Sequence, residues 1–374
     1  MKILLVRLRL IGDVVLTTPL VRAVRRRYPD AHLAYAVEPL AAEVIRGNPH
    51  LDEIIEVPRR RGLGRWRDDL TWGRALRRRR FDVAVDLHGG PRGAWLTWAS
   101  GAPTRIGYRT RGRSWMYTHV VARPADLGPL HSVVKQWALV APLDVEACDP
   151  ARDPVEMPAD PAAEARVAGW LAEAGIEPRH PLVLVHVSAG NPYRRWPPAY
   201  FAALVAALVR EDPARRVVLT SGPSEAHAAR ALVDEMRAAA PETAAALRHG
   251  AFELGELRAL TARAAVYIGG DSGPLHIAAT TTTPIVGLFG PTLAERSMPW
   301  RDARWRAEAV DAGSLPCRPC RQRTCVPGDF RCLTRIDPAR VAAAAERAIE
   351  RPQASGPRPQ PETSGEAWAL GPGA

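Results

Sequence analysis

Asp271 and Ser272 are the residues whose types and surroundings point most directly to chemistry. The apolar run Ala264–Ile268 before them has the length and β-branched content of a strand, and a helix-length segment opens near Pro274. Asp and Ser are preferred N-cap residues, and the free amides of a helix N-terminus favour an anion such as a diphosphate. From the residues alone, this is either an anion site or an ordinary turn with Asp271 as the helix cap.

The surrounding pattern describes a βαβ unit. Gly269 and Gly270 are expected to break the first apolar run, and Ile285–Phe289 is a second run of strand length. Ligands of open α/β sheets bind at the carboxyl ends of strands. The turn that holds Asp271 is therefore placed where such a ligand would lie.

A second carboxylate, Asp13, follows the first buried-type run, Lys2–Leu8. We expect a helix over Val14–Tyr28 with Asp13 at its N-cap. The helix dipole would favour the ionised carboxylate, which could then accept a proton at neutral pH. Asp13 is thus either a helix cap or a general base, and the two roles are compatible.

A third turn follows the apolar run Pro181–Val187. It contains Ser188, Arg194 and Arg195 and leads into a helix that opens at Pro197. A hydroxyl group and paired guanidinium groups at the start of a helix would suit a phosphate. The alternative is a simple strand–helix loop with exposed arginines.

Three separated motifs resemble, in the right order, those of glycosyltransferase family nine, the ADP-heptose:lipopolysaccharide heptosyltransferases. They are Ile11-Gly12-Asp13-Val14-Val15-Leu16-Thr17-Thr18-Pro19, Arg194-Arg195-Trp196-Pro197 after a small-residue turn, and Asp271–Ala279 followed by Phe289-Gly290-Pro291-Thr292. The resemblance covers roughly residues 1–350. It implies an α/β protein of the GT-B type, with two facing Rossmann-like domains, parallel sheets and the active site in the cleft between them.

The resemblance also implies an activity, which is inverting transfer of heptose from ADP-heptose to the lipopolysaccharide inner core. Asp13 stands at the position of the proposed catalytic base. Arg194 stands where the family has a Lys that contacts the donor diphosphate, and it replaces a point charge with a fork. Glu225 matches an acidic residue expected near the ribose. The implied donor site comprises Ser188, Arg194, Arg195, Glu225, Asp271, Ser272, Gly273, Pro274 and His276.

The charge is concentrated in the first half of the chain. The whole chain has a formal net charge of +11, and residues 1–150 contribute +10 of it, from 25 Lys and Arg against 15 Asp and Glu. This asymmetry predicts an anionic partner. Arg59, Arg60 and Arg61 form either a solvated loop or, as the resemblance implies, part of the surface that faces the acidic acceptor, together with Gly12.

Four of the five cysteines lie in one segment with the spacing Cys-x2-Cys-x4-Cys-x6-Cys. They are Cys317, Cys320, Cys325 and Cys332. Four thiolates can form a tetrahedral zinc site, and disulfides are disfavoured in the cytosol. A structural zinc site and unliganded or redox cysteines are the alternatives. For catalysis we expect no cofactor, because the chain lacks the Asp-x-Asp pair with which other glycosyltransferases hold a divalent ion.

The Asp- and Pro-rich stretch Asp144–Pro161 is expected to link an acceptor domain (1–150) to a donor domain (151–336). A helix over 337–351 and a disordered tail over 352–374 would follow. No apolar run is long enough to span a membrane, and Arg7 and Arg9 interrupt the N-terminal one, so we expect a cytoplasmic protein on the inner face of the inner membrane.

Three other functions fit parts of this sequence. Another nucleotide sugar or acceptor within the same family is one, and a nucleotide-sugar epimerase of the same two-domain shape is another. A nucleic-acid-binding module is disfavoured, because the basic excess and the cysteines lie in different halves and the aromatic residues are not interleaved with the charge.

Overall fold

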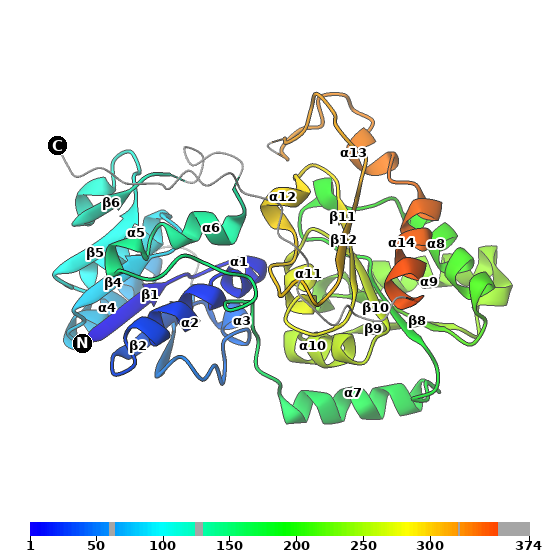
Figure 1. Cartoon of the computed structure of the whole chain (residues 1–374), viewed down its shortest axis with the longest axis horizontal. Coiled ribbons are helices and arrows are strands. Elements are labelled where there is room, and N and C mark those ends of the chain that lie inside the picture. Colours follow the sequence, from blue (N-terminus) through cyan, green and yellow to red (C-terminus); the bar gives the residue numbers. More distant parts are fainter. Residues whose placement is uncertain (60–63, 124–129, 321, 351–374) are drawn as a thin grey trace.

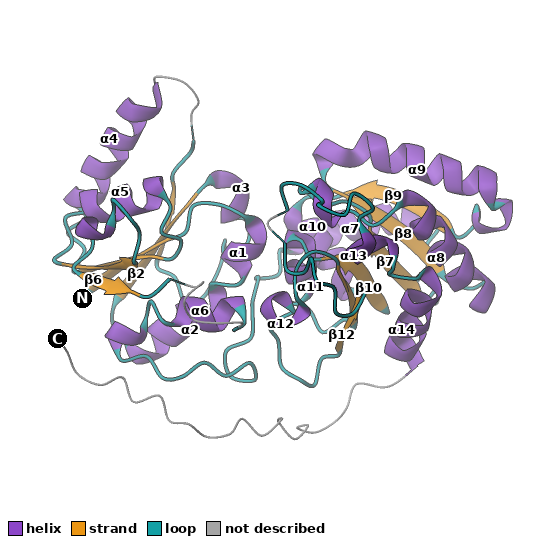
Figure 2. Ribbon diagram, turned by 90° about the horizontal axis from the view of Figure 1, so that it is seen from above, coloured by secondary structure: helices purple, strands orange, loops and turns teal. Residues whose placement is uncertain are grey.

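The computed structural model describes residues 1–59, 64–123, 130–320 and 322–350, so Arg60, Arg61 and the tail 352–374 lie outside the described residues. Within these ranges the chain forms two sheets of six strands each (Figure 1). Every strand pair is parallel, and helices lie on both sides of each sheet (Figure 2). The α/β class with two parallel sheets is confirmed.

The first domain has the strand order β3-β2-β1-β4-β5-β6. Its strands are β1 (Lys2–Val6), β2 (His32–Val37), β3 (Glu53–Glu56), β4 (Val83–Asp86), β5 (Thr104–Tyr108) and β6 (His119–Val121). Its helices are α1 (Ile11–Val15), α2 (Thr18–Arg27), α3 (Pro39–Ala42), α4 (Gly64–Arg78), α5 (Pro91–Ala99) and α6 (Ser132–Trp137). This is the doubly wound order of dinucleotide-binding folds, and the direction of winding reverses between β1 and β4.

The second domain repeats this order, since β12-β11-β10-β7-β8-β9 reads the same when it is numbered from its own first strand. Its strands are β7 (Leu182–His186), β8 (Arg216–Ser221), β9 (Leu247–Ala251), β10 (Val266–Gly270), β11 (Ile285–Phe289) and β12 (Ala307–Asp311). Its helices are α7 (Pro161–Glu173), α8 (Pro198–Glu211), α9 (Ala226–Ala239), α10 (Leu254–Ala262), α11 (Gly273–Ala278), α12 (Ala294–Ser297), α13 (Arg331–Thr334) and α14 (Pro338–Glu350). Its winding reverses between β7 and β10.

The central strands are apolar throughout because helices cover both of their faces. In β1, Leu4 and Val6 pack with residues of α4 and α5, whereas Ile3 and Leu5 face the cluster that includes α2 and α6. In the second domain, α8 and α14 pack together over one face of the sheet, and α7 and α10 cover the other. The C-terminal helix α14 therefore belongs to the second core.

The expected N-cap role of Asp13 is wrong. The amide of Val14 donates to the carbonyl of Leu10, so helix α1 begins at Ile11 and Asp13 lies within its first turn. The expected continuous helix is also interrupted. Pro19 has no N–H to offer the carbonyl of Val15, and the hydroxyl of Thr18 donates to that carbonyl instead, at 2.8 Å.

The expected break at Gly269 and Gly270 is also wrong, because both residues belong to β10. Gly269 pairs with His186 of β7, and Gly270 pairs with Leu288 of β11, so the ladder continues on both sides. Asp271 is therefore the first residue beyond the strand. No helix in the described part of the chain has the length and apolarity needed to cross a membrane.

The two domains touch at the start of α6. The Oγ atom of Ser132 donates to the carbonyl of Arg296 at 2.8 Å, and Nε2 of His131 lies 2.9 Å from the carbonyl of Met298. Nδ1 of His131 accepts from the amide of Val133, so Nε2 carries the proton of a neutral ring. Burial lowers the pKa of His131 to about 4.

This buried imidazole predicts an acid-sensitive contact between the domains. The folded-state pKa of His131 is below its unfolded value of about 6.5, so its stabilising contribution is complete above that pH and is lost as pH falls toward 4. Between pH 7 and pH 5 the loss should be about 2 kcal/mol. Unfolding at both pH values should show that His131→Gln reduces the acid sensitivity, whereas substitution of the exposed His119 by Gln leaves it unchanged. Equal acid sensitivity of wild type and His131→Gln would contradict this assignment.

Candidate active site

The two sheets meet at the carboxyl ends of their central strands. Helix α1, which follows β1, packs against α11, which follows β10. At the closest point the backbones of Gly12 and Gly273 face each other. A Cβ atom on Gly12 would lie 3.2 Å from Cα of Gly273, and one on Gly273 would lie 3.3 Å from the backbone nitrogen of Gly12. Open α/β sheets bind ligands where their winding reverses, and the two reversal points face each other here.

On the first-domain side, Asp13 forms an ion pair with Arg7. The Arg7 side chain is only 7% exposed, and its Nη1 atom lies 2.9 Å from both the carbonyl of Leu87 and Nδ1 of His88. Because a guanidinium group only donates, His88 accepts through Nδ1 and is neutral. Burial and the charge of Arg7 lower the pKa of His88. Arg7 therefore joins the ends of β1 and β4 and fixes the carboxylate of Asp13.

On the second-domain side, the buried carboxylate of Asp271 is the centre of a polar cluster. Its Oδ2 atom accepts from Oγ1 of Thr292 at 2.6 Å and lies 3.2 Å from Nη1 of Arg194. Its Oδ1 atom lies 3.8 Å from Nε2 of His276. The N-cap residue of α11 is Ser272, and its Oγ donates to the carbonyl of Gly270 at 3.2 Å. Asp271 thus links three segments and does not cap the helix.

Arg194 is held from two directions. Its Nη1 atom donates to the carbonyl of Asp271 at 2.9 Å, and its Nε atom donates to Oε1 of Gln322 at 2.7 Å. The side chain keeps 30% of its surface exposed. A guanidinium fork oriented in this way retains exposed surface for a further anion.

His276 lies buried between the two carboxylates. Burial lowers its pKa and Arg194 lowers it further, while the charges of Asp271 and Asp13 oppose the shift. The ring is therefore neutral at physiological pH. Its Nδ1 atom has no hydrogen-bond partner among the described residues. Gly12 lies against Cδ2 of the same ring, so His276 belongs to the contact between the domains as well as to the polar cluster around Asp271.

The other expected donor residues follow neighbouring strands of the second sheet. Ser188 comes after β7, and its Oγ atom lies 3.0 Å from Nε2 of His186. Arg195 donates to the carbonyl of Ala189 at 2.9 Å and to Oε1 of Glu225 at 2.8 Å. Gly273 and Pro274 open helix α11. The carboxylate of Glu225 is thus already engaged by the neighbouring arginine.

The acceptor-side residues are only partly described. Arg59 is exposed and follows the edge strand β3, and Gly12 lies at the contact with α11. Arg7, Thr292 and Gln322 belong to the site but were not predicted from the sequence. Arg7 carried a signal, because it is a charged residue inside a run that is otherwise apolar. Thr292 belongs to the third motif, but no role was predicted for it. Nothing in the sequence indicated that Gln322 would lie in the site.

Removal of the Thr292 hydroxyl should destabilise the polar cluster around Asp271. Thr292→Val takes a donor away from a buried carboxylate, which costs about 1–3 kcal/mol. Chemical denaturation should resolve this loss. The matched control is Thr71→Val on the exposed face of α4, expected to change stability by less than about 0.5 kcal/mol. If both variants behave alike, the hydroxyl does not support Asp271.

Residues 70–330 match the family model described as glycosyltransferase family 9 (heptosyltransferase). Lipopolysaccharide heptosyltransferase 3 of Escherichia coli is 27% identical over 323 residues, which cover 84% of this chain and 91% of that protein. Lipopolysaccharide heptosyltransferase 2 of Salmonella typhimurium is 25% identical over 305 residues, covering 80% and 85%.

Solved structures agree with the fold. A family 9 glycosyltransferase of Veillonella parvula has a TM-score of 0.81 at 22% identity and covers 93% of this chain and 97% of that one. ADP-heptose lipopolysaccharide heptosyltransferase II of E. coli has a TM-score of 0.73 at 22% identity, covering 93% and 98%. The E. coli heptosyltransferase WaaC with ADP-2-deoxy-2-fluoro heptose has a TM-score of 0.62 at 18% identity, covering 94% and 99%. The two facing sheets thus have the GT-B arrangement, and the chain belongs to glycosyltransferase family 9.

Proposed function

We propose that this glycosyltransferase transfers heptose from ADP-heptose to a hydroxyl group of the lipopolysaccharide inner core, with inversion of the anomeric centre. One observation carries the proposal: a fixed carboxylate, Asp13, lies across the α1–α11 contact from a cluster formed by Arg194, Asp271 and His276. The matching relatives are named as heptosyltransferases acting on lipopolysaccharide, and WaaC has been solved with an ADP-heptose analogue.

In the proposed reaction the oxygen of an acceptor hydroxyl attacks the anomeric carbon of the donor. The bond from that carbon to the diphosphate oxygen breaks, and ADP leaves from the opposite face, which inverts the configuration. Asp13 takes the proton of the attacking hydroxyl. Arg7 positions the carboxylate through their ion pair.

The departing ADP gains negative charge on its diphosphate. Arg194, Ser188 and the backbone amides of Ser272 and Gly273 would stabilise this charge. Asp271 holds Arg194 in place, and Asp271 and His276 would contact the donor sugar or its phosphates. Because these groups would stabilise the charge on the diphosphate, we propose that the transfer requires no divalent ion.

The nucleotide would extend along the neighbouring strand ends. Glu225 would accept hydrogen bonds from the ribose hydroxyls, and Arg195 already contacts that carboxylate. A ribose that binds Glu225 would therefore share or displace Arg195.

The acceptor is proposed to be the anionic core of lipopolysaccharide, contacted by Gly12, Arg59, Arg60 and Arg61. The net charge of +10 over residues 1–150 suits this partner and the anionic surface of the inner membrane. We accordingly propose a peripheral location on the cytoplasmic face of that membrane, with no role in nucleic-acid binding.

Release of ADP tests the activity directly. Purified enzyme should release ADP from ADP-heptose only when an acceptor bearing Kdo or heptose is present, at the same rate with and without added magnesium. Release from a different nucleotide sugar would point to another donor within the family. Conversion of the donor sugar without any acceptor would instead identify an epimerase.

Asp13→Asn separates base catalysis from structure. The substitution keeps the side-chain shape but removes the proton acceptor, so turnover should fall about 10²–10⁴-fold. ADP affinity should change little. The melting temperature should fall modestly, because the buried Arg7 loses its counter-charge but keeps its bonds to Leu87 and His88. The control is substitution of the exposed Asp30 by Asn. Turnover within about threefold of wild type would show that the base lies elsewhere.

Arg194→Ala should weaken binding of ADP. Loss of a charged donor to phosphate is expected to raise the dissociation constant roughly 10- to 100-fold, measured by calorimetry. Because Arg194 also bonds to Asp271 and Gln322, a modest fall in melting temperature should accompany it. Substitution of the exposed Arg210 on α8 by Ala should leave both quantities unchanged. Unchanged ADP affinity in Arg194→Ala would remove this residue from the donor site.

A further inference from the structure

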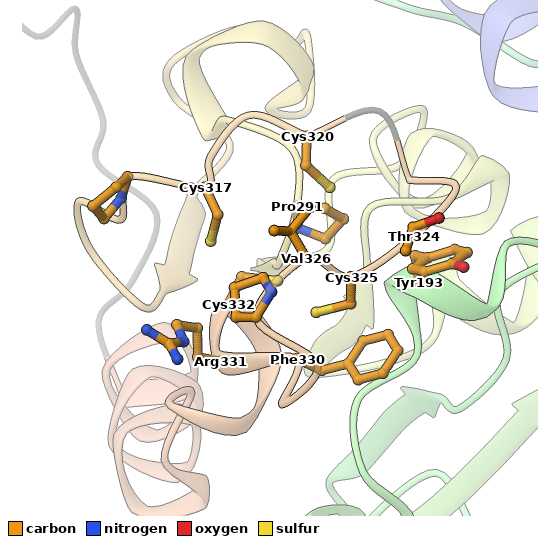
Figure 3. A pocket seen from close by; sticks show the side chains of 12 residues that line it. Tyr193, Pro291, Cys317, Cys320, Thr324, Cys325, Val326, Phe330, Arg331 and Cys332 are labelled. Atoms are coloured by element: carbon orange, nitrogen blue, oxygen red, sulfur yellow. The ribbon is translucent and has the colours of Figure 1, made fainter.

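The four clustered cysteines line one cavity of about 330 Å³ beside the polar cluster around Asp271. Figure 3 shows Cys317, Cys320, Cys325 and Cys332 around this cavity, with their side chains directed toward its interior. All four are free thiols, and the fifth, Cys148, lies in the linker outside the cavity.

Apolar residues line much of the remaining cavity wall, among them Pro291, Val326 and Phe330. Cys332 is buried, and the other three cysteines of the cavity are partly buried. Four thiols brought together in this way repel one another once ionised, unless a cation neutralises them. The cavity is the space that all four side chains line.

The four side chains line the cavity without yet closing on a common point. Within the described ranges, no group of three or more His, Cys, Asp or Glu side chains has metal-binding geometry. Residues 312–330 contain no helix or strand in the described part, and Val326 is 90% exposed, so a contraction of this segment would break no hydrogen bond of a helix or sheet. Zn–S bonds of about 2.3 Å require such a contraction.

We propose that Cys317, Cys320, Cys325 and Cys332 bind one thiophilic metal ion, with zinc as the best fit, in a structural site that closes this segment. Four thiolates match the tetrahedral coordination of zinc, and a site with four protein ligands keeps no open position for catalysis. The ion therefore stabilises the segment and takes no part in glycosyl transfer.

The segment is attached directly to the polar cluster around Asp271. Gln322 lies between the second and third cysteines, and its Oε1 atom accepts from Nε of Arg194 at 2.7 Å and from Nδ2 of Asn191 at 2.8 Å. Gln322 has a φ of 54°, in the left-handed region, so its neighbours must hold it there. Arg318, between the first two cysteines, donates to the carbonyl of Thr292 at 2.8 Å.

The ion would thus hold the loop that orients Arg194. This part of the inference rests on the proposed donor role of Arg194, whereas the metal site itself does not. Loss of the ion should loosen the loop, so that Gln322 no longer holds Arg194 and Arg318 no longer holds the carbonyl of Thr292. The expected consequence is weaker binding of ADP without any change in the residues that touch it.

Metal analysis of the full-length chain tests the site. Protein purified under reducing conditions and loaded with Zn²⁺ alone should retain about one equivalent, and at most Cys148 should react with a thiol reagent. Chelation should expose all five thiols and lower the melting temperature. Cys148→Ser should retain the metal, and the double variant Cys317→Ser/Cys332→Ser should not. The site would be overturned if the loaded wild type retained no zinc and all five thiols reacted. It would also be overturned if the four cysteines were found to form disulfide bonds.

Calorimetry with ADP tests the link to the donor site. Stripping the metal should raise the dissociation constant about tenfold, and Gln322→Ala should do the same while it keeps the metal. Equal ADP affinity of loaded and stripped protein would overturn the link and leave the metal site standing. Failure of the loaded wild type to bind ADP would instead overturn the donor assignment, without affecting the metal result.

Discussion

The structure depends on the close contact between α1 and α11. Gly12 and Gly273 bring the two helix starts together, and a Cβ atom on either would collide with the opposite domain or press against it. Since each helix follows a central strand, this contact also fixes the distance between the carboxyl edges of the two sheets. Asp13 and His276 reach a shared space because the backbones of Gly12 and Gly273 face each other there.

Each domain places one arginine and one aspartate at the point where its winding reverses. Arg7 holds Asp13 in the first domain, and Arg194 holds Asp271 in the second. Both arginines also bond to groups on a neighbouring segment, so neither carboxylate depends on its own loop for its orientation. In a family 9 glycosyltransferase, such fixed charges are available to a substrate without reorganisation.

The sequence predicted the central strands well because these strands are buried on both faces. The run Ile285–Phe289 was placed without error, and the α/β class and the family are confirmed. The outer strands β6, β9 and β12 were not predicted, since they are short and partly exposed.

The start of helix α1 could not be predicted either. It depends on a positive φ at Leu10, a backbone conformation that a leucine residue does not indicate. The link from Gln322 to Arg194 crosses more than a hundred residues of sequence, so no local pattern could reveal it.

In its described part, the chain passes from one domain to the other once, through residues 144–160, and α14 stays with the second core (Figure 1). Each domain is therefore one uninterrupted stretch of the coding sequence. A single recombination event within the linker would exchange an entire first or second domain and leave every strand pairing inside each sheet intact. New combinations of the two halves would have to restore the match where the halves touch. These places include the glycine contact, the start of α6, and the hydrogen bond from the amide of Gly255 to Oε1 of Glu43 at 2.6 Å.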